Sequence, residues 1–206
     1  MRIGITMLAV FVLSASPGKC RGQGTMRFTF EAQPPGSSAN IFEYSESGML
    51  FTGPHLNQLW LFGGSLSGYP DDGTGYLGVP AGSQLRFNFN PLATFSLISF
   101  DVAEYDTTLP GSVALHVVGY RNDMTIVSTD FTTDGVNDGT GPLQDFQTFY
   151  LDSSFVNLGR VDILSSRFAI DNVVISGVPE PSAGALTLLG VTCMLWFRRA
   201  GKFWRV

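Results

Sequence analysis

Turn-forming residues interrupt this chain so often between Thr25 and Gly177 that no long helix can form there. Breakers such as Pro34-Pro35-Gly36, Asp71-Asp72-Gly73 and Asp134-Gly135 separate short apolar segments. Within Leu85–Phe89, apolar and polar residues alternate, as they do in a strand with one buried face. About ten such segments follow one another, with turns roughly every 8–12 residues. The pattern predicts an all-β domain, an antiparallel β-sandwich of the jelly-roll kind.

The composition agrees with short strands joined by tight turns, since the chain has 24 Gly and 17 Phe and only 14% of its residues are charged. The predicted domain covers residues 22–177. Its predicted strands are 27–30, 49–51, 59–62, 85–89, 95–102, 113–120, 124–131, 146–151, 161–164 and 168–175.

Charge is distributed unevenly along the chain. The formal net charge is −5, but residues 25–178 hold 16 Asp and Glu against five Arg and no Lys, a formal charge of −11. A body this acidic repels a phosphate backbone, which argues against nucleic-acid binding. The two cysteines, Cys20 and Cys193, flank the domain on its two sides, so they provide neither a disulfide framework nor a zinc site within it.

The first 21 residues have the pattern of a secretory signal peptide. Arg2 precedes the apolar run Ile3–Leu13, and the small residues Ser14–Ser16 follow. The run is too short to span a bilayer core of roughly 30 Å as a helix. We therefore expect an exported chain whose mature form begins after Ser16 or within a few residues of it.

The last 29 residues, 178–206, combine a Pro-Glu-Pro motif with an apolar run and a basic end. The motif is Pro179, Glu180 and Pro181, and the run Ala183–Phe197 has 15 residues, about 22 Å as a helix. The closing Arg and Lys residues favour the cytoplasmic side of a membrane. The tail is thus predicted to be a transmembrane helix that follows an extended segment, because two prolines two residues apart disfavour helix and strand.

This order of features resembles the PEP-CTERM sorting signal of Gram-negative and related bacteria. The resemblance implies that an exosortase, a membrane protease, recognises Pro179, Glu180 and Pro181 and removes the tail during export, while Arg198 and Arg199 act as the membrane stop. Members of this family are often tied to exopolysaccharide and biofilm production. The resemblance therefore implies an exported surface or matrix protein with a structural or adhesive role.

The domain itself resembles the jelly-roll modules joined to such tails, in the segments Phe28–Glu31, Ser96–Ala103 and Phe168–Val174. Carbohydrate-binding jelly rolls have a similar outline, and in those, carboxylates near the first and last strands can hold a structural Ca²⁺. The resemblance implies three candidate ligands. These are Glu31, Asp101 and Asp171. The alternative is that the three are solvated carboxylates at strand ends.

A polysaccharide ligand would be bound by exposed aromatic rings. Tyr69 and Tyr76 are the candidates, because they lie in the Gly- and Asp-rich segment 67–78, which is predicted to be an exposed loop. The alternative is that both rings pack in the core, as we expect for Trp60. The resulting hypotheses are a structural or adhesive surface protein and a calcium-supported carbohydrate-binding module.

Signals of catalysis are weak. The sequence contains no Gly-x-Ser-x-Gly elbow, phosphate-binding loop or dinucleotide fingerprint. His116 is expected on the exposed side of a strand, and Asp130–Gly135 begins like a calcium loop but has Gly141 at the twelfth position. We predict that the chain is not an enzyme, and an exported hydrolase that uses His116 is the third hypothesis.

The sorting hypothesis predicts that Glu180→Ala leaves a full-length, membrane-retained precursor in a host with an exosortase. The change removes the charged member of the recognition motif outside the strand pattern, so the domain should melt as in the wild type. Deleting everything after Gly177 should give a soluble secreted domain with the same fold. Immunoblots of membrane and medium fractions distinguish these products, and wild-type release of the Glu180→Ala protein would mean an ordinary anchor.

Overall fold

The computed structural model describes residues 24–53, 58–89, 93–106, 108, 111–136 and 145–177. These residues form 13 strands in two antiparallel sheets and contain no helix. The predicted all-β class and the antiparallel β-sandwich are confirmed. The predicted signal peptide and the predicted sorting tail lie outside the described residues.

The first sheet has seven strands. Six follow the order β11-β8-β13-β6-β5-β2, and β1 also pairs with β13. The bounds are β1 (Thr25–Phe28), β2 (Ser38–Ile41), β5 (Leu59–Phe62), β6 (Tyr76–Val79), β8 (Ser96–Glu104), β11 (Gln147–Tyr150) and β13 (Phe168–Ser176).

The second sheet has six strands in the order β10-β9-β12-β7-β4-β3. The bounds are β3 (Glu43–Glu46), β4 (Met49–Thr52), β7 (Leu85–Phe89), β9 (Ala114–Arg121), β10 (Ile126–Thr132) and β12 (Leu158–Ile163).

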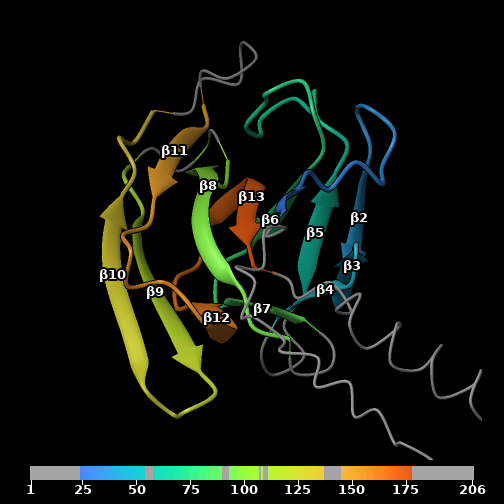
Figure 1. Ribbon diagram of the computed structural model, residues 1–206. Coiled ribbons are helices and arrows are strands. Elements are labelled where there is room, and N and C mark those ends of the chain that lie inside the picture. The colour runs from blue at the N-terminus through green and yellow to red at the C-terminus, as the bar shows by residue number, and fades with distance from the viewer. Residues whose placement is uncertain are drawn as a thin grey trace, which may run out of the picture.

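The chain crosses between the two sheets repeatedly. From β6 onwards every connection passes from one sheet to the other, except the hairpin that joins β9 to β10. Crossing connections of this kind are typical of jelly rolls. Figure 1 shows the β9–β10 hairpin on one side of the molecule and β5 and β2 on the other, with β8 and β13 between them.

The main core lies between the sheets and is rich in phenylalanine. Alternate residues of each strand point inward, as in β7, where Leu85, Phe87 and Phe89 are buried and the two residues between them are not. Phe51 of β4 is completely buried and its ring centroid lies 4.9 Å from that of Phe30. Close aromatic packing of this kind supplies the stability that the cysteine-free domain needs.

All ten predicted strands are present, with ends that differ by up to three residues. Three further strands were not predicted. They are β2, β3 and β6. β2 and β3 lie at sheet edges and contain Ser, Asn and Glu in place of an apolar run, while β6 contains Gly78 and follows a Gly- and Asp-rich segment. These three strands are stabilised by pairing with neighbouring strands rather than by the strand propensity of their own residues.

Phe51→Ala should lower the free energy of unfolding by about 3–5 kcal/mol, because the ring is buried among other rings and its removal leaves a cavity. The matched control is Phe42→Ala, which removes the same ring from a position that is 58% exposed. The control should change the free energy by less than about 0.5 kcal/mol. Urea unfolding of both variants tests the prediction, and equal losses would contradict the two-sheet core.

Candidate functional site

The outer face of the seven-stranded sheet carries a second aromatic cluster, separate from the main core. Phe62 of β5 and Tyr76 of β6 are buried in it. Trp60, Tyr69 and Tyr105 pack against it and are half-buried. We call these last three rings the aromatic platform. They come from β5, from the segment between β5 and β6, and from the residue that directly follows β8.

Phe62 holds the platform together. Its ring centroid lies 4.8 Å from that of Tyr69 and 6.2 Å from those of Trp60 and Tyr105. Tyr69 and Tyr105 meet edge to face at 5.8 Å. The three partly exposed rings therefore pack on one buried ring. This shared contact holds their relative positions more firmly than those of isolated surface rings.

Gly78 gives these rings room to lie on the sheet. A Cβ atom at this position of β6 would lie 2.6 Å from Cε2 of Phe62 and 2.9 Å from Cε2 of Tyr105. Side chains cannot approach so closely, so any larger residue would lift the rings. Gly78, which weakened the strand pattern of β6 in the sequence, thus leaves the space that the platform rings occupy.

The prediction that Tyr76 is an exposed ligand-binding ring is wrong. The segment 67–78 ends in strand β6, and there Tyr76 has no exposed surface. Its ring stacks on Phe62 at 4.9 Å, and burial raises the pKa of its hydroxyl well above the usual range. Tyr69, the other candidate, is half-buried and remains available as part of the platform. Trp60, expected in the core, packs at the edge of this second cluster.

Carboxylates order the loop that carries Tyr69. Asp71 Oδ1 accepts hydrogen bonds from the backbone N–H groups of Ser65 and Gly73, at 3.0 and 2.8 Å. Asp145 Oδ2 accepts one from the backbone of Asp71 at 3.1 Å, although the two residues are far apart in sequence. These bonds fold the loop over the outer face of the sheet, where its ring can join the platform.

Asp171 is the most unusual of the acidic residues. It has no exposed surface, and its Oδ1 has no hydrogen-bond partner among the described residues. Its Oδ2 accepts a hydrogen bond from Nδ2 of Asn172 at 2.9 Å and lies 3.1 Å from Oγ1 of Thr74, which also bonds Asp72. Burial, and then the charge of Asp72, raise the pKa of Asp171 to about 9. The carboxyl group is therefore neutral at neutral pH.

The three candidate calcium ligands do not form a ready-made site. Asp101 and Asp171 are direct cross-strand partners on β8 and β13, but Asp101 Oδ1 accepts a hydrogen bond from Thr148 at 2.6 Å. Glu31 Oε2 accepts one from the backbone of Gly75 at 3.2 Å. Within the described ranges, no three His, Cys, Asp or Glu residues are placed to hold a metal ion. Calcium binding stays a prediction.

His116 lies on the outer face of the other sheet. Leu115 and Val117 beside it are buried, as the alternation predicts. Its Nδ1 lies 2.6 Å from Asp130 Oδ1, whereas Ser165 Oγ accepts a hydrogen bond from the His116 backbone. In the part of the chain that the structure describes, no hydroxyl group bonds to the imidazole ring.

The predicted sorting motif, Pro179, Glu180 and Pro181, lies outside the described residues, as do Arg198 and Arg199. Among the residues that are described, there is no helix whose length and hydropathy would let it cross a membrane.

The buried neutral carboxyl of Asp171 predicts a pH-dependent stability. Between the pKa of an unfolded Asp, about 4, and the folded value of about 9, only the folded state keeps this proton. The free energy of unfolding should therefore fall as the pH rises from 5 to 8, by at most about 1.4 kcal/mol per pH unit. Asp171→Asn keeps the shape without the titration, so its urea-unfolding profile should lose this slope. Equal slopes in both proteins would contradict the assignment.

Thermal melts of the wild type over the same pH range test calcium binding. An ion shared by Glu31, Asp101 and Asp171 binds only the folded state and requires an ionised Asp171, so millimolar Ca²⁺ should raise the melting temperature relative to EDTA and weaken the pH slope. Superimposable melts would contradict the calcium prediction.

No protein-family model matches the sequence, and no curated protein matches it. Among solved structures, a single-residue variant of a family 29 carbohydrate-binding module is 12% identical, with a TM-score of 0.32, over 76% of this chain and 94% of that one. A second family 29 variant is 13% identical, with a TM-score of 0.33 and the same coverage. The CBM22-1 and GH10 modules of Clostridium thermocellum endo-1,4-β-D-xylanase 10B, complexed with xylohexaose, are 15% identical, with a TM-score of 0.35, over 73% of this chain and 28% of that one. What this chain binds has to be inferred from its own surface.

Proposed function

We propose that this chain is an exported carbohydrate-binding protein that holds a polysaccharide against its aromatic platform. One observation carries the proposal: Trp60, Tyr69 and Tyr105 are partly exposed on one sheet face, and all three pack on the buried ring of Phe62. Rings in this setting offer apolar faces that keep their positions when a ligand arrives.

Sugar rings have apolar faces of C–H groups and polar edges of hydroxyl groups. An aromatic ring covers the apolar face, and tyrosine adds a hydroxyl group that can hydrogen-bond at the edge. Because the platform rings are supported from below, binding costs little side-chain entropy. Three supported rings together can hold a chain of sugars rather than a single one.

Carboxylates beside the platform supply hydrogen-bond acceptors for sugar hydroxyls. Asp106 follows Tyr105 directly and is near enough to its ring to help raise the pKa of the Tyr105 hydroxyl, after burial and Tyr69. Asp71 lies in the loop that carries Tyr69 and is partly exposed. A few polar groups around an aromatic surface are the usual means of orienting a ligand.

The geometry favours binding over catalysis at this face. Glycoside hydrolysis needs one protonated and one ionised carboxyl group on opposite sides of a substrate bond. Asp171 and Asp72 are 0% and 6% exposed, so a sugar cannot pass between their carboxyl groups. Their shared contact with Thr74 suits a structural role.

Export gives such a domain access to its ligand. In this proposal, the signal peptide exports the chain and the Pro179-Glu180-Pro181 segment is the recognition site of an exosortase-type protease. The processed protein then acts at the cell surface or in the extracellular matrix, in a structural or adhesive role linked to exopolysaccharide. The jelly-roll domain supplies the contact with polysaccharide.

Removing one platform ring should weaken polysaccharide binding at least about tenfold, the equivalent of roughly 1.4 kcal/mol. Affinity electrophoresis or a glycan array with wild type, Tyr69→Ala and Tyr105→Ala measures this effect. Tyr69→Phe should keep most of the affinity, because it retains the ring. Thermal melts of each variant separate loss of binding from loss of fold.

The matched control is Phe42→Ala, since Phe42 is an exposed ring that contacts none of the platform rings within the described ranges. Its polysaccharide binding should equal that of the wild type. Unchanged binding by both tyrosine-to-alanine variants would contradict the proposal, and hydrolysis of a glycan that is lost with His116→Ala would favour the hydrolase hypothesis instead.

A further inference from the structure

The outer face of the six-stranded sheet carries a cluster of arginines around one aspartate. Arg86 donates hydrogen bonds to the Asp162 carboxylate from Nε at 2.9 Å and from Nη2 at 3.0 Å, which makes a bidentate ion pair. Nε of Arg160 lies 3.2 Å from the same Asp162 Oδ1, but without hydrogen-bond geometry. Asp162 is 3% exposed, whereas the side chains of Arg86 and Arg160 are 35% and 36% exposed.

One carboxylate cannot balance two guanidinium groups, so this cluster keeps a positive charge. It also keeps unused donors: among the described residues, Nη1 of Arg86 and both terminal nitrogens of Arg160 make no hydrogen bond. Nε of Arg160 is buried and equally without a hydrogen-bond partner. A guanidinium group is a planar set of donors that can bind a carboxylate through bidentate hydrogen bonds.

Neighbouring residues hold these donors in place. The guanidinium carbon of Arg160 lies 3.9 Å above the ring centroid of Tyr120, a cation–π contact. Arg121 adds a third positive charge close to Asp123, and its three nitrogens donate only to uncharged oxygens, those of Thr125, Ser154 and Val156. The arginines are therefore fixed before any ligand arrives.

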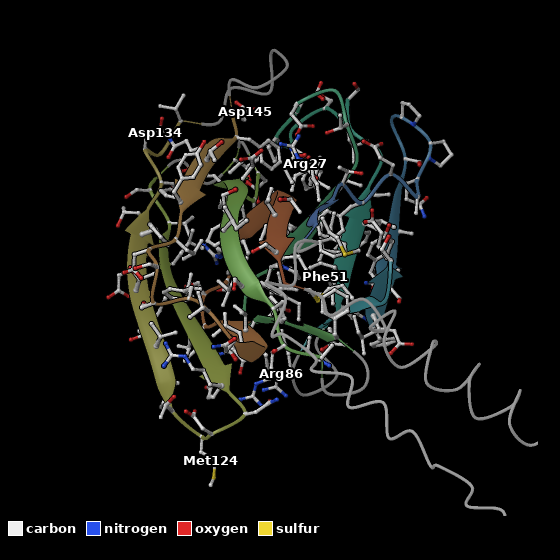
Figure 2. The ribbon with its side chains drawn as sticks, viewed as in Figure 1. Arg27, Phe51, Arg86, Met124, Asp134 and Asp145 are labelled. Carbon is white, nitrogen blue, oxygen red and sulfur yellow. The ribbon has the colours of Figure 1, made fainter. Side chains whose placement is uncertain are left out.

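These residues line a cleft of about 600 Å³ beside the β9–β10 hairpin. Arg86, Arg121 and Arg160 line it together with Tyr120, Met124 and Ile126, and its described lining contains no Asp or Glu. Figure 2 shows Arg86 and Met124 at one end of the molecule and Asp134 and Asp145 at the opposite end. Three of the five arginines in this acidic domain thus gather around one cleft.

We propose that this cleft is a second binding site and that it takes the carboxylate of an acidic sugar. The terminal nitrogens of Arg160 and Nη1 of Arg86 receive the carboxylate. The exposed side chains of Met124 and Ile126 cover the apolar face of the sugar ring. The choice of a sugar as the carrier of the carboxylate rests on the proposed function, whereas the anion site rests on the arginines alone.

The charge of the domain limits which anion fits. Residues 25–178 have a formal charge of −11, so a dense polyanion or an anionic membrane is repelled over most of the surface. A polymer with widely spaced carboxylates avoids this repulsion and still satisfies the local positive charge. Two exposed apolar side chains are also few for membrane insertion. The cleft therefore suits a sugar chain with an occasional acidic residue.

The test is a titration of the ¹⁵N-labelled full-length chain with methyl glucuronoside, followed by NMR through the arginine Nε–H and Gly159 signals at low ionic strength. Saturable shifts are expected at these positions, and methyl glucoside, the neutral counterpart, should bind there at least tenfold more weakly. Arg160→Gln should weaken glucuronoside binding at least fivefold, and Arg160→Lys should restore part of it. Arg27→Gln, the same change at an exposed arginine outside the cleft, should have no effect.

A second pair of variants does not touch the Arg86–Asp162–Arg160 cluster. Ile126 is 62% exposed, so Ile126→Glu should fold normally and weaken glucuronoside binding by repulsion, while Ile126→Gln, which removes the apolar contact without adding charge, should weaken it less. Equal binding of glucuronoside and glucoside, equal binding of acetate, unchanged binding by Ile126→Glu, or binding only to anionic phospholipid vesicles would each overturn the proposal. Tyr69→Ala should leave this site intact, so failure of the platform and failure of the cleft can be distinguished.

Discussion

The structure depends on the pairing of β13, the last strand of the sandwich. β13 pairs with β8 along most of its length and, on its other side, first with β6 and then with β1. The first and last strands are thus neighbours, and the domain closes only when its two ends meet. The first half of β13 is buried on both faces, with Phe168 and Ile170 in the main core and Ala169 under the outer cluster. The residues beneath the outer aromatic cluster, such as Ala103 and Gly78, are small because the strands there are covered on both faces.

The strands that build the core could be predicted because their residues alternate. Leu85–Phe89 was predicted with the bounds that the structure has, and its burial alternates as the sequence does. β2 and β6 could not be predicted in this way. β2 is a polar edge strand that is fixed by pairing with β5, and β6 is buried on both faces, so it shows no alternation. Pairing between distant segments, which no local pattern records, decides these strands.

The candidate site was predicted only in part for the same reason. Tyr69 and Tyr76 look alike in the sequence, since both lie in a segment rich in Gly and Asp. They differ in the structure, because the segment packs on the sheet and Tyr76 is buried in the outer cluster, while Tyr69 stays partly exposed. Asp171 was expected as a metal ligand, but Thr74, whose Oγ1 contacts both Asp171 and Asp72, comes from a segment about 100 residues away. The Arg86–Asp162–Arg160 cluster likewise joins strands that are far apart in sequence.

The inner faces of the two sheets are alike, but their outer faces differ, and each carries a polar arrangement that costs stability. Asp171 is buried in β13 with one unpaired oxygen, and Arg160 has a buried nitrogen without a hydrogen bond beside the cleft. An unpaired buried polar atom costs about 1–3 kcal/mol, and an apolar side chain of similar size in its place often costs nothing. The stability of the fold therefore does not explain why Asp171 and Arg160 occupy these positions. Both costs fall on the outer faces of the sheets, and the proposed binding at these faces would account for them.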